Sequence, residues 1–129
     1  MSKISVLSAA VLSASLIATV SSAQAQKTLY LAGYGGSIET VMKEKVLPAW
    51  EQANDAKIEY LPGNSTTTLA KLQAQKANQE IDVAFIDDGP MSQAIALGFC
   101  KTVEDKGSLS GIYDSAILGD GKALGFGYI

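Results

Sequence analysis

The sequence predicts an α/β fold built on a doubly wound, mostly parallel sheet, and two observations lead to this class. The chain has 129 residues, a length that suits one small domain. After residue 25, short apolar runs alternate with segments of helical periodicity, in the order strand, helix, strand, helix, strand, helix. Because strand–helix–strand crossovers are right-handed, we expect parallel strands with helices on both faces of the sheet.

Residues 1–25 have the pattern of an export signal. Lys3 supplies a positive start, residues 4–20 form an uncharged apolar run, and Ala23-Gln24-Ala25 matches a small-x-small cleavage site. A membrane anchor is the alternative interpretation, but this run contains several serines and is short for a bilayer span. We therefore expect cleavage after Ala25 and a periplasmic location.

The first expected elements of the exported chain are a strand and a long helix. Residues 28–32 form a short apolar run that ends at a glycine, which is typical of a buried strand. Ser37 is expected to cap the next helix, in which residues 38–46 carry apolar side chains at helical spacing. Pro48 is expected to kink or restart this helix, because proline removes a main-chain donor.

A second strand and helix follow. Residues 58–61 are expected to be a strand, stopped by a Pro-Gly pair. The next helix is expected over residues 67–77, and three consecutive polar residues compete for its N-cap position: Asn64, Ser65 and Thr66.

The third strand is predicted over residues 81–86 and ends in the turn sequence Asp-Asp-Gly-Pro. A short helix is then expected over residues 91–97, with Gly98 in the position after its C-cap. Residues 101–115 are polar and weakly patterned. A further strand is expected to begin within residues 123–129.

Flexible and polar residues follow each of the first three strands. Because the carboxyl ends of parallel strands meet at one edge of a sheet, we expect these loops to converge there and to bind a ligand. Main-chain amides at a helix start suit an anion, whereas paired carboxylates suit an ammonium group or a cation. The predicted ligand-binding residues are Tyr34, Gly35, Gly36, Ser37, Asn64, Ser65, Thr66, Asp87 and Asp88.

Simpler interpretations of single residues stay open. Ser37, Ser65 and Asp87 could act only as helix caps. Tyr34 could stack on an organic ligand or bind ferric iron as a phenolate, although an iron site would need further Tyr or His in these loops. We expect no cofactor and no metal.

Composition excludes several classes of function. The chain has 10 basic and 13 acidic residues, contains no Arg or His, and has a formal net charge of −3. It therefore lacks the basic surface and guanidinium contacts of a nucleic-acid binder, and it cannot form a His-based triad or a His metal cluster. Its one cysteine, Cys100, cannot form an internal disulfide, and it lies too far from the cleavage site to carry a lipid anchor.

Three motifs, in this order after the export signal, resemble a known family. They are residues 30–37 (YLAGYGGS), residues 62–76 (PGNST followed by LAKLQAQK after two residues) and residues 81–90 (IDVAFIDDGP). They resemble the extracellular solute-binding proteins of ATP-binding-cassette importers, in the spermidine/putrescine-like branch. The resemblance spans residues 26–129. It implies a periplasmic-binding-protein-like fold of two hinged lobes, of which these residues form the N-terminal, incomplete part of lobe 1.

By this resemblance the chain is a transport protein and not an enzyme. It would act as a monomer that captures a small polar solute, polyamine-like or another organic ion, and delivers it to the membrane permease. One alternative is an exported α/β hydrolase or phosphatase that uses Asp87 and Asp88. Such an enzyme would have no His to act as its general base, because the sequence contains none. A second alternative is a truncated lobe that binds nothing by itself.

Overall fold

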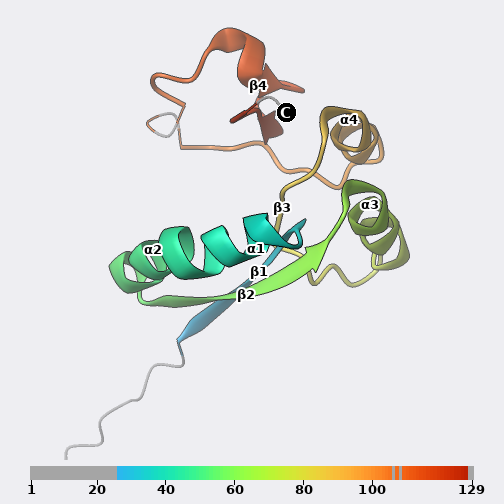
Figure 1. Cartoon of the computed structure of the whole chain (residues 1–129). Helices are drawn as coiled ribbons and strands as arrows, with labels where there is room; N and C mark the ends of the chain where they lie inside the picture. The colour runs from blue at the N-terminus through green and yellow to red at the C-terminus, as the bar shows by residue number, and fades with distance from the viewer. Residues whose placement is uncertain (1–25, 106, 108, 128–129) are drawn as a thin grey trace, which may run out of the picture.

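The computed structural model describes residues 26–105, 107 and 109–127. The predicted export signal, residues 1–25, and the last two residues of the predicted strand 123–129 lie outside this range. Within it, the chain forms a mixed α/β structure (Figure 1). No helix of the described residues is long and apolar enough to cross a membrane.

The main sheet contains three parallel strands in the order β2-β1-β3. These strands are β1 (Lys27–Tyr34), β2 (Ala56–Gly63) and β3 (Val83–Ala84). The register places Leu31 of β1 beside Tyr60 of β2 and Val83 of β3. The predicted parallel sheet is therefore confirmed. β1 extends beyond the predicted residues 28–32, because its pairing with β2 continues through Tyr34.

Between residues 37 and 96 of the described chain, five helical segments cover or follow this sheet. The long helix predicted after β1 is interrupted by a π-helical turn, and Pro48 lies at the start of the segment that follows the turn, where its missing N–H costs nothing. The segments are α1 (Ser37–Val41), η1 (Met42–Val46), α2 (Leu47–Asn54), α3 (Ser65–Ala74) and α4 (Asp88–Ala96).

Several predicted helix boundaries are wrong by a few residues. Gly36, and not Ser37, occupies the N-cap position of α1, with a left-handed φ of 67° that favours glycine. The third helix begins at Ser65 instead of residue 67, because Asn64 caps it. The fourth begins at Asp88 instead of residue 91. Gly98 follows the C-cap of α4 with φ 77°, as predicted.

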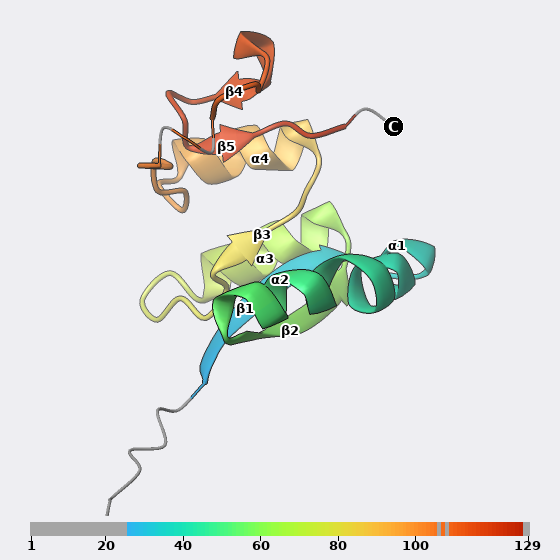
Figure 2. The same cartoon turned by 90° about the vertical axis from the view of Figure 1, so that its left-hand side faces the viewer.

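Helices pack on both faces of the sheet, as the prediction of a doubly wound sheet requires. Figure 2 shows α2 on the near side of β1 and β2, with α3 on the far side. Adjacent residues of β1 point to opposite faces, so Leu31 belongs to one buried cluster and Ala32 to the other. The α2 side buries Leu31, Leu47 and Tyr60; the α3 and α4 side buries Ala32, Leu69, Leu72, Ile81, Ile86 and Ala94.

The last part of the described chain forms a small antiparallel pair. It consists of β4 (Ile117–Leu118) and β5 (Ala123–Leu124), and the 3-10 turn η2 (Asp114–Ala116) precedes β4. Of the predicted strand over 123–129, only Ala123 and Leu124 form a strand among the described residues. This strand pairs antiparallel with β4 and does not join the main sheet. It turns back on β4 because successive residues at 119–121, two of them glycines, adopt positive φ.

Candidate functional site

The three predicted loops converge at the carboxyl edge of the sheet. The hydroxyl of Tyr34, at the end of β1, donates a hydrogen bond to Oδ1 of Asp87, which follows β3. Ser65, at the start of α3, donates its hydroxyl to Oδ2 of Asp87 at 2.7 Å and accepts the Asp87 amide at 2.9 Å. The Tyr34 and Ser65 hydroxyl oxygens are 3.3 Å apart. We call these three residues the edge triad.

The edge triad keeps Asp87 charged and Tyr34 neutral. Hydrogen bonds from Tyr34 and from Ser65 lower the pKa of the Asp87 carboxyl below its ordinary value. Partial burial, together with the hydrogen bond to this carboxylate, raises the pKa of Tyr34. Both directions fit a phenol that donates to a carboxylate. At neutral pH the site therefore contains a fixed negative charge whose two oxygens already accept protein donors.

A second tyrosine fixes the main chain next to this triad. The hydroxyl of Tyr60 donates to the carbonyl of Tyr34 at 2.7 Å, and its ring lies against Gly33. A β-carbon at position 33 would lie 2.9 Å from Cζ of Tyr60, so only glycine leaves room for this ring. Tyr60 is buried, and burial raises the pKa of its hydroxyl, which remains a donor at neutral pH.

A row of aromatic rings extends from the triad. The rings of Tyr34 and Phe85 meet edge to face, with centroids 5.0 Å apart and an interplanar angle of 78°. The ring centroid of Phe85 lies 4.2 Å from that of Phe126, and Phe126 is 74% exposed. An exposed phenylalanine ring, in a row of rings that starts at the triad, suits the binding of an organic cation, since the ring face attracts positive charge.

The remaining predicted residues of the first loop play different parts. The Gly35 amide donates to the carbonyl of Gly63 at 3.3 Å, which ties the first loop to the second. Gly36 turns the chain into α1 and accepts the Thr40 amide at 3.2 Å. Ser37 is exposed, and its side chain does not cap the helix.

The other predicted residues flank the triad. Asn64 forms a capping box: its side chain accepts the Thr67 amide at 2.9 Å, while the Thr67 hydroxyl accepts the Asn64 amide. Thr66 is exposed in the first turn of α3. Asp88 is exposed, and its Oδ1 accepts the Gly89 amide at 2.7 Å. Asn64 is therefore the predicted cap that forms, whereas Asp88 still offers a solvent-facing carboxylate.

Asp87 occupies the N-cap position of α4, yet its side chain does not cap the helix, because both oxygens accept bonds from the other two triad residues. The interpretation of Asp87 as a simple cap is therefore wrong. The interpretation of Ser65 as a cap is also wrong, since it lies inside α3 and its hydroxyl contacts Asp87.

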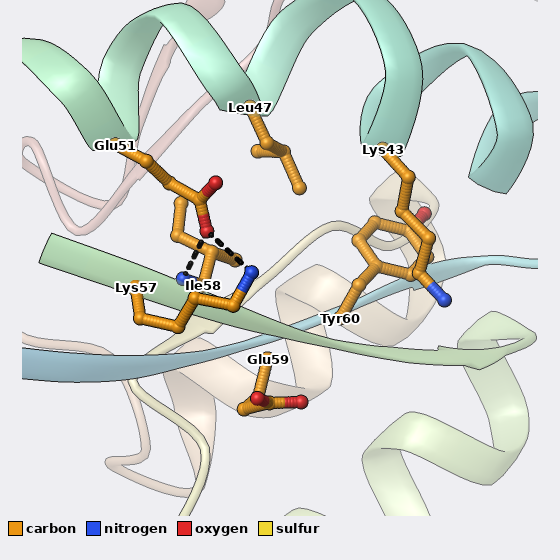
Figure 3. Close-up of a pocket in the computed structure, with 7 residues that line it drawn as sticks. All are labelled: Lys43, Leu47, Glu51, Lys57, Ile58, Glu59 and Tyr60. Carbon is orange, nitrogen blue, oxygen red and sulfur yellow. Dashed lines mark hydrogen bonds and ion pairs between the residues drawn. The ribbon is translucent and has the colours of Figure 1, made fainter.

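Two of the hollows among the described residues lie away from the edge triad. One, of about 300 Å³, lies between α2 and β2 (Figure 3). The other, of about 240 Å³, lies on α1 and includes Ser37. Among the described residues, no group of three or more His, Cys, Asp or Glu side chains is arranged to hold a metal ion.

Reasoning from the sequence missed Tyr60, Phe85 and Phe126. All three lie in or beside runs that were interpreted as buried strands, where an aromatic side chain signals packing. Tyr60 and Phe85 are each next to last in their runs, close to the loops, and this position was the available signal. Comparison of the chain with protein-family models, with curated proteins and with solved structures finds no match.

Proposed function

We propose that this chain forms part of a solute-binding lobe of an exported receptor, with a periplasmic-binding-protein-like fold and an organic cation as its ligand. In this proposal the receptor acts as a monomer in the periplasm and delivers its solute to the permease of an ATP-binding-cassette importer. The observation that carries the proposal is the convergence of the edge triad and the aromatic row at one edge of the sheet.

The strand order supports a ligand at this edge. The chain leaves β1 and passes through α1 and α2 to β2, which lies on one side of β1. It then passes through α3 to β3, which lies on the other side of β1. Open α/β sheets bind ligands outside the carboxyl ends of their strands, at the point where the winding changes direction. Tyr34 and Asp87 lie on the two sides of that point.

The charges at the edge favour a cation over an anion. Asp87 is ionised, and Asp88 beside it is exposed. Phe85 and Phe126 add ring faces, which attract a desolvated ammonium group by roughly 0.5–2 kcal/mol. In this proposal Asp88 and Phe126 contact the ligand, whereas Asp87 orients Tyr34.

Thermal unfolding of the full chain tests the proposal. The screen compares a polyamine with an amino acid, a phosphonate and ferric ion, each added in large excess. A ligand whose concentration is about 100 times its Kd stabilises the folded protein by about 2.7 kcal/mol, which is measurable as a rise in Tm. We expect the polyamine to give this rise.

Two variants locate the binding. Asp88→Asn removes a solvent-facing charge without touching the triad, and it should abolish the polyamine-dependent rise. Glu44→Gln makes the same charge change in η1, away from the edge, and should leave the rise unchanged. An unchanged response of Asp88→Asn would contradict the cation assignment. Turnover of a generic phosphatase or esterase substrate, with no solute raising Tm, would contradict the receptor proposal and favour the hydrolase.

A further inference from the structure

The outer edge of β2 has no strand beside it among the described residues. β2 is eight residues long and stands at the end of the sheet, paired with β1 on one side only. Its other side borders the hollow beneath α2 (Figure 3). Such an edge offers main-chain donors and acceptors to any extended chain that reaches it.

One hydrogen bond reveals which groups point outward. The Ile58 amide donates to Oε1 of Glu51 at 2.7 Å, so the main chain of Ile58 faces away from β1. Main-chain groups of a strand alternate between its two sides, so Ala56 and Tyr60 also present theirs outward. Pro62 is the next outward position and has no N–H to offer. The usable edge therefore runs from Ala56 to Tyr60.

Glu51 blocks the centre of this edge. Besides the Ile58 amide, its Oε1 lies 3.3 Å from Nζ of Lys57 (Figure 3). The hydrogen bond from Ile58 and the neighbouring lysine lower the pKa of the Glu51 carboxyl, so it stays charged at neutral pH. Any strand that pairs with β2 has to displace this carboxylate first.

The edge is complementary to itself. In an antiparallel pair of two copies centred on Ile58, Lys57 of each copy lies opposite Glu59 of the other, and Ala56 lies opposite Tyr60. The outward groups of 56, 58 and 60 then meet one another, as hydrogen-bonded pairs of an antiparallel ladder require. Opposite charges that face each other across strands stabilise such a pair, whereas like charges destabilise it.

We propose that the outer edge of β2 is a self-association surface for a second copy of this chain, paired antiparallel about Ile58, and that Glu51 is a latch that keeps it closed. A two-fold axis through the Ile58 pair joins the two sheets into one of six strands. Displacing the latch also releases Lys57 from Glu51 to contact Glu59 of the second copy.

Sedimentation velocity of the full chain, over about a hundredfold range of concentration, tests the latch. The wild type should remain monomeric. Glu51→Ala removes the latch, and Glu51→Asp shortens it by one methylene; each should raise the association constant by about tenfold or more, since a charge-assisted hydrogen bond no longer competes. Glu51→Gln keeps an acceptor at the same reach but loses the charge, so it should associate less strongly than Glu51→Ala. Circular dichroism checks that each variant is folded.

A charge exchange tests the register. In the Glu51→Ala background, Lys57→Glu places like charges opposite each other and should restore the monomer. Adding Glu59→Lys reverses both charges and should restore the dimer. The proposal is overturned if folded Glu51→Ala and Glu51→Asp variants both remain monomeric. It is equally overturned if the association constant does not change with the charge exchange, or if the wild type dimerises as strongly as the variants.

Discussion

Gly33→Ala should destabilise the fold at the point where β1 meets the candidate site. The new β-carbon would lie 2.9 Å from Cζ and 3.2 Å from Cε2 of Tyr60, and closer still to its hydroxyl oxygen. The ring therefore has to move. That movement breaks the 2.7 Å hydrogen bond that holds the Tyr34 carbonyl.

The magnitude follows from three contributions. Overpacking costs about 1–3 kcal/mol, and loss of one partly buried hydrogen bond costs about 0.5–1.5 kcal/mol. Alanine also restricts the unfolded chain, which offsets about 0.4–1 kcal/mol. We expect a net loss of about 0.5–4 kcal/mol in the free energy of unfolding, a large share of the roughly 5–15 kcal/mol of a typical domain.

Urea unfolding followed by circular dichroism measures this loss. Gly89→Ala is the matched control, because no atom lies within 4 Å of its added β-carbon, and it should not destabilise the fold. In a Tyr60→Phe background the nearest contact and the hydrogen bond are already absent, so Gly33→Ala should cost about 1 kcal/mol less than in the wild type. Wild-type stability of Gly33→Ala, or an equal cost in both backgrounds, would contradict a clash with the Tyr60 ring.

Four further predictions concern the loops and the ends of the strands. Ser65→Ala leaves the Asp87 amide without its acceptor and should destabilise the fold by about 1–3 kcal/mol in urea unfolding; a neutral result would contradict the triad. Asn64→Ala removes the capping box and should cost about 1 kcal/mol, seen as a lower Tm, whereas the exposed Thr66→Ala beside it should cost less. The stability difference between wild type and Asp87→Asn should persist at neutral pH and vanish as pH falls below about 4, because the folded pKa of Asp87 is lowered and its contribution is lost on protonation. The pKa of Tyr34 is raised, so its contribution to stability should be complete below about pH 10 and should be lost as the pH rises further. In an NMR titration, an Asp87 carboxyl signal that titrates above its ordinary range would contradict the predicted loss of stability in acid.

Much of the fold could be predicted because its signals are local. Apolar runs ended by glycine or proline located β1 and β2, and right-handed crossovers implied their parallel pairing. The convergence of Tyr34, Ser65 and Asp87 followed from that topology alone. Element boundaries were less certain, because Ser37 and Gly36 both suit a helix start and only the main-chain turn decides between them.

Features that depend on long-range contacts could not be predicted. Phe126 contacts Phe85 although 41 positions separate them in the chain, and no sequence periodicity predicts that contact. The Glu51 latch depends on where an α2 side chain meets the edge of β2. The antiparallel turn of β5 onto β4 depends on positive φ at 119–121, and the non-glycine Asp120 is among those residues.

An NMR titration of the full chain with a polyamine is the decisive experiment for the proposed cation-binding edge. Amide shifts report weak binding as well as tight binding. We expect the polyamine to shift the amides of Gly35, Asp88 and Phe126 in a saturable manner, while phosphate leaves them unchanged. Shifts caused by phosphate instead, or polyamine shifts confined to residues outside this edge, would contradict the account.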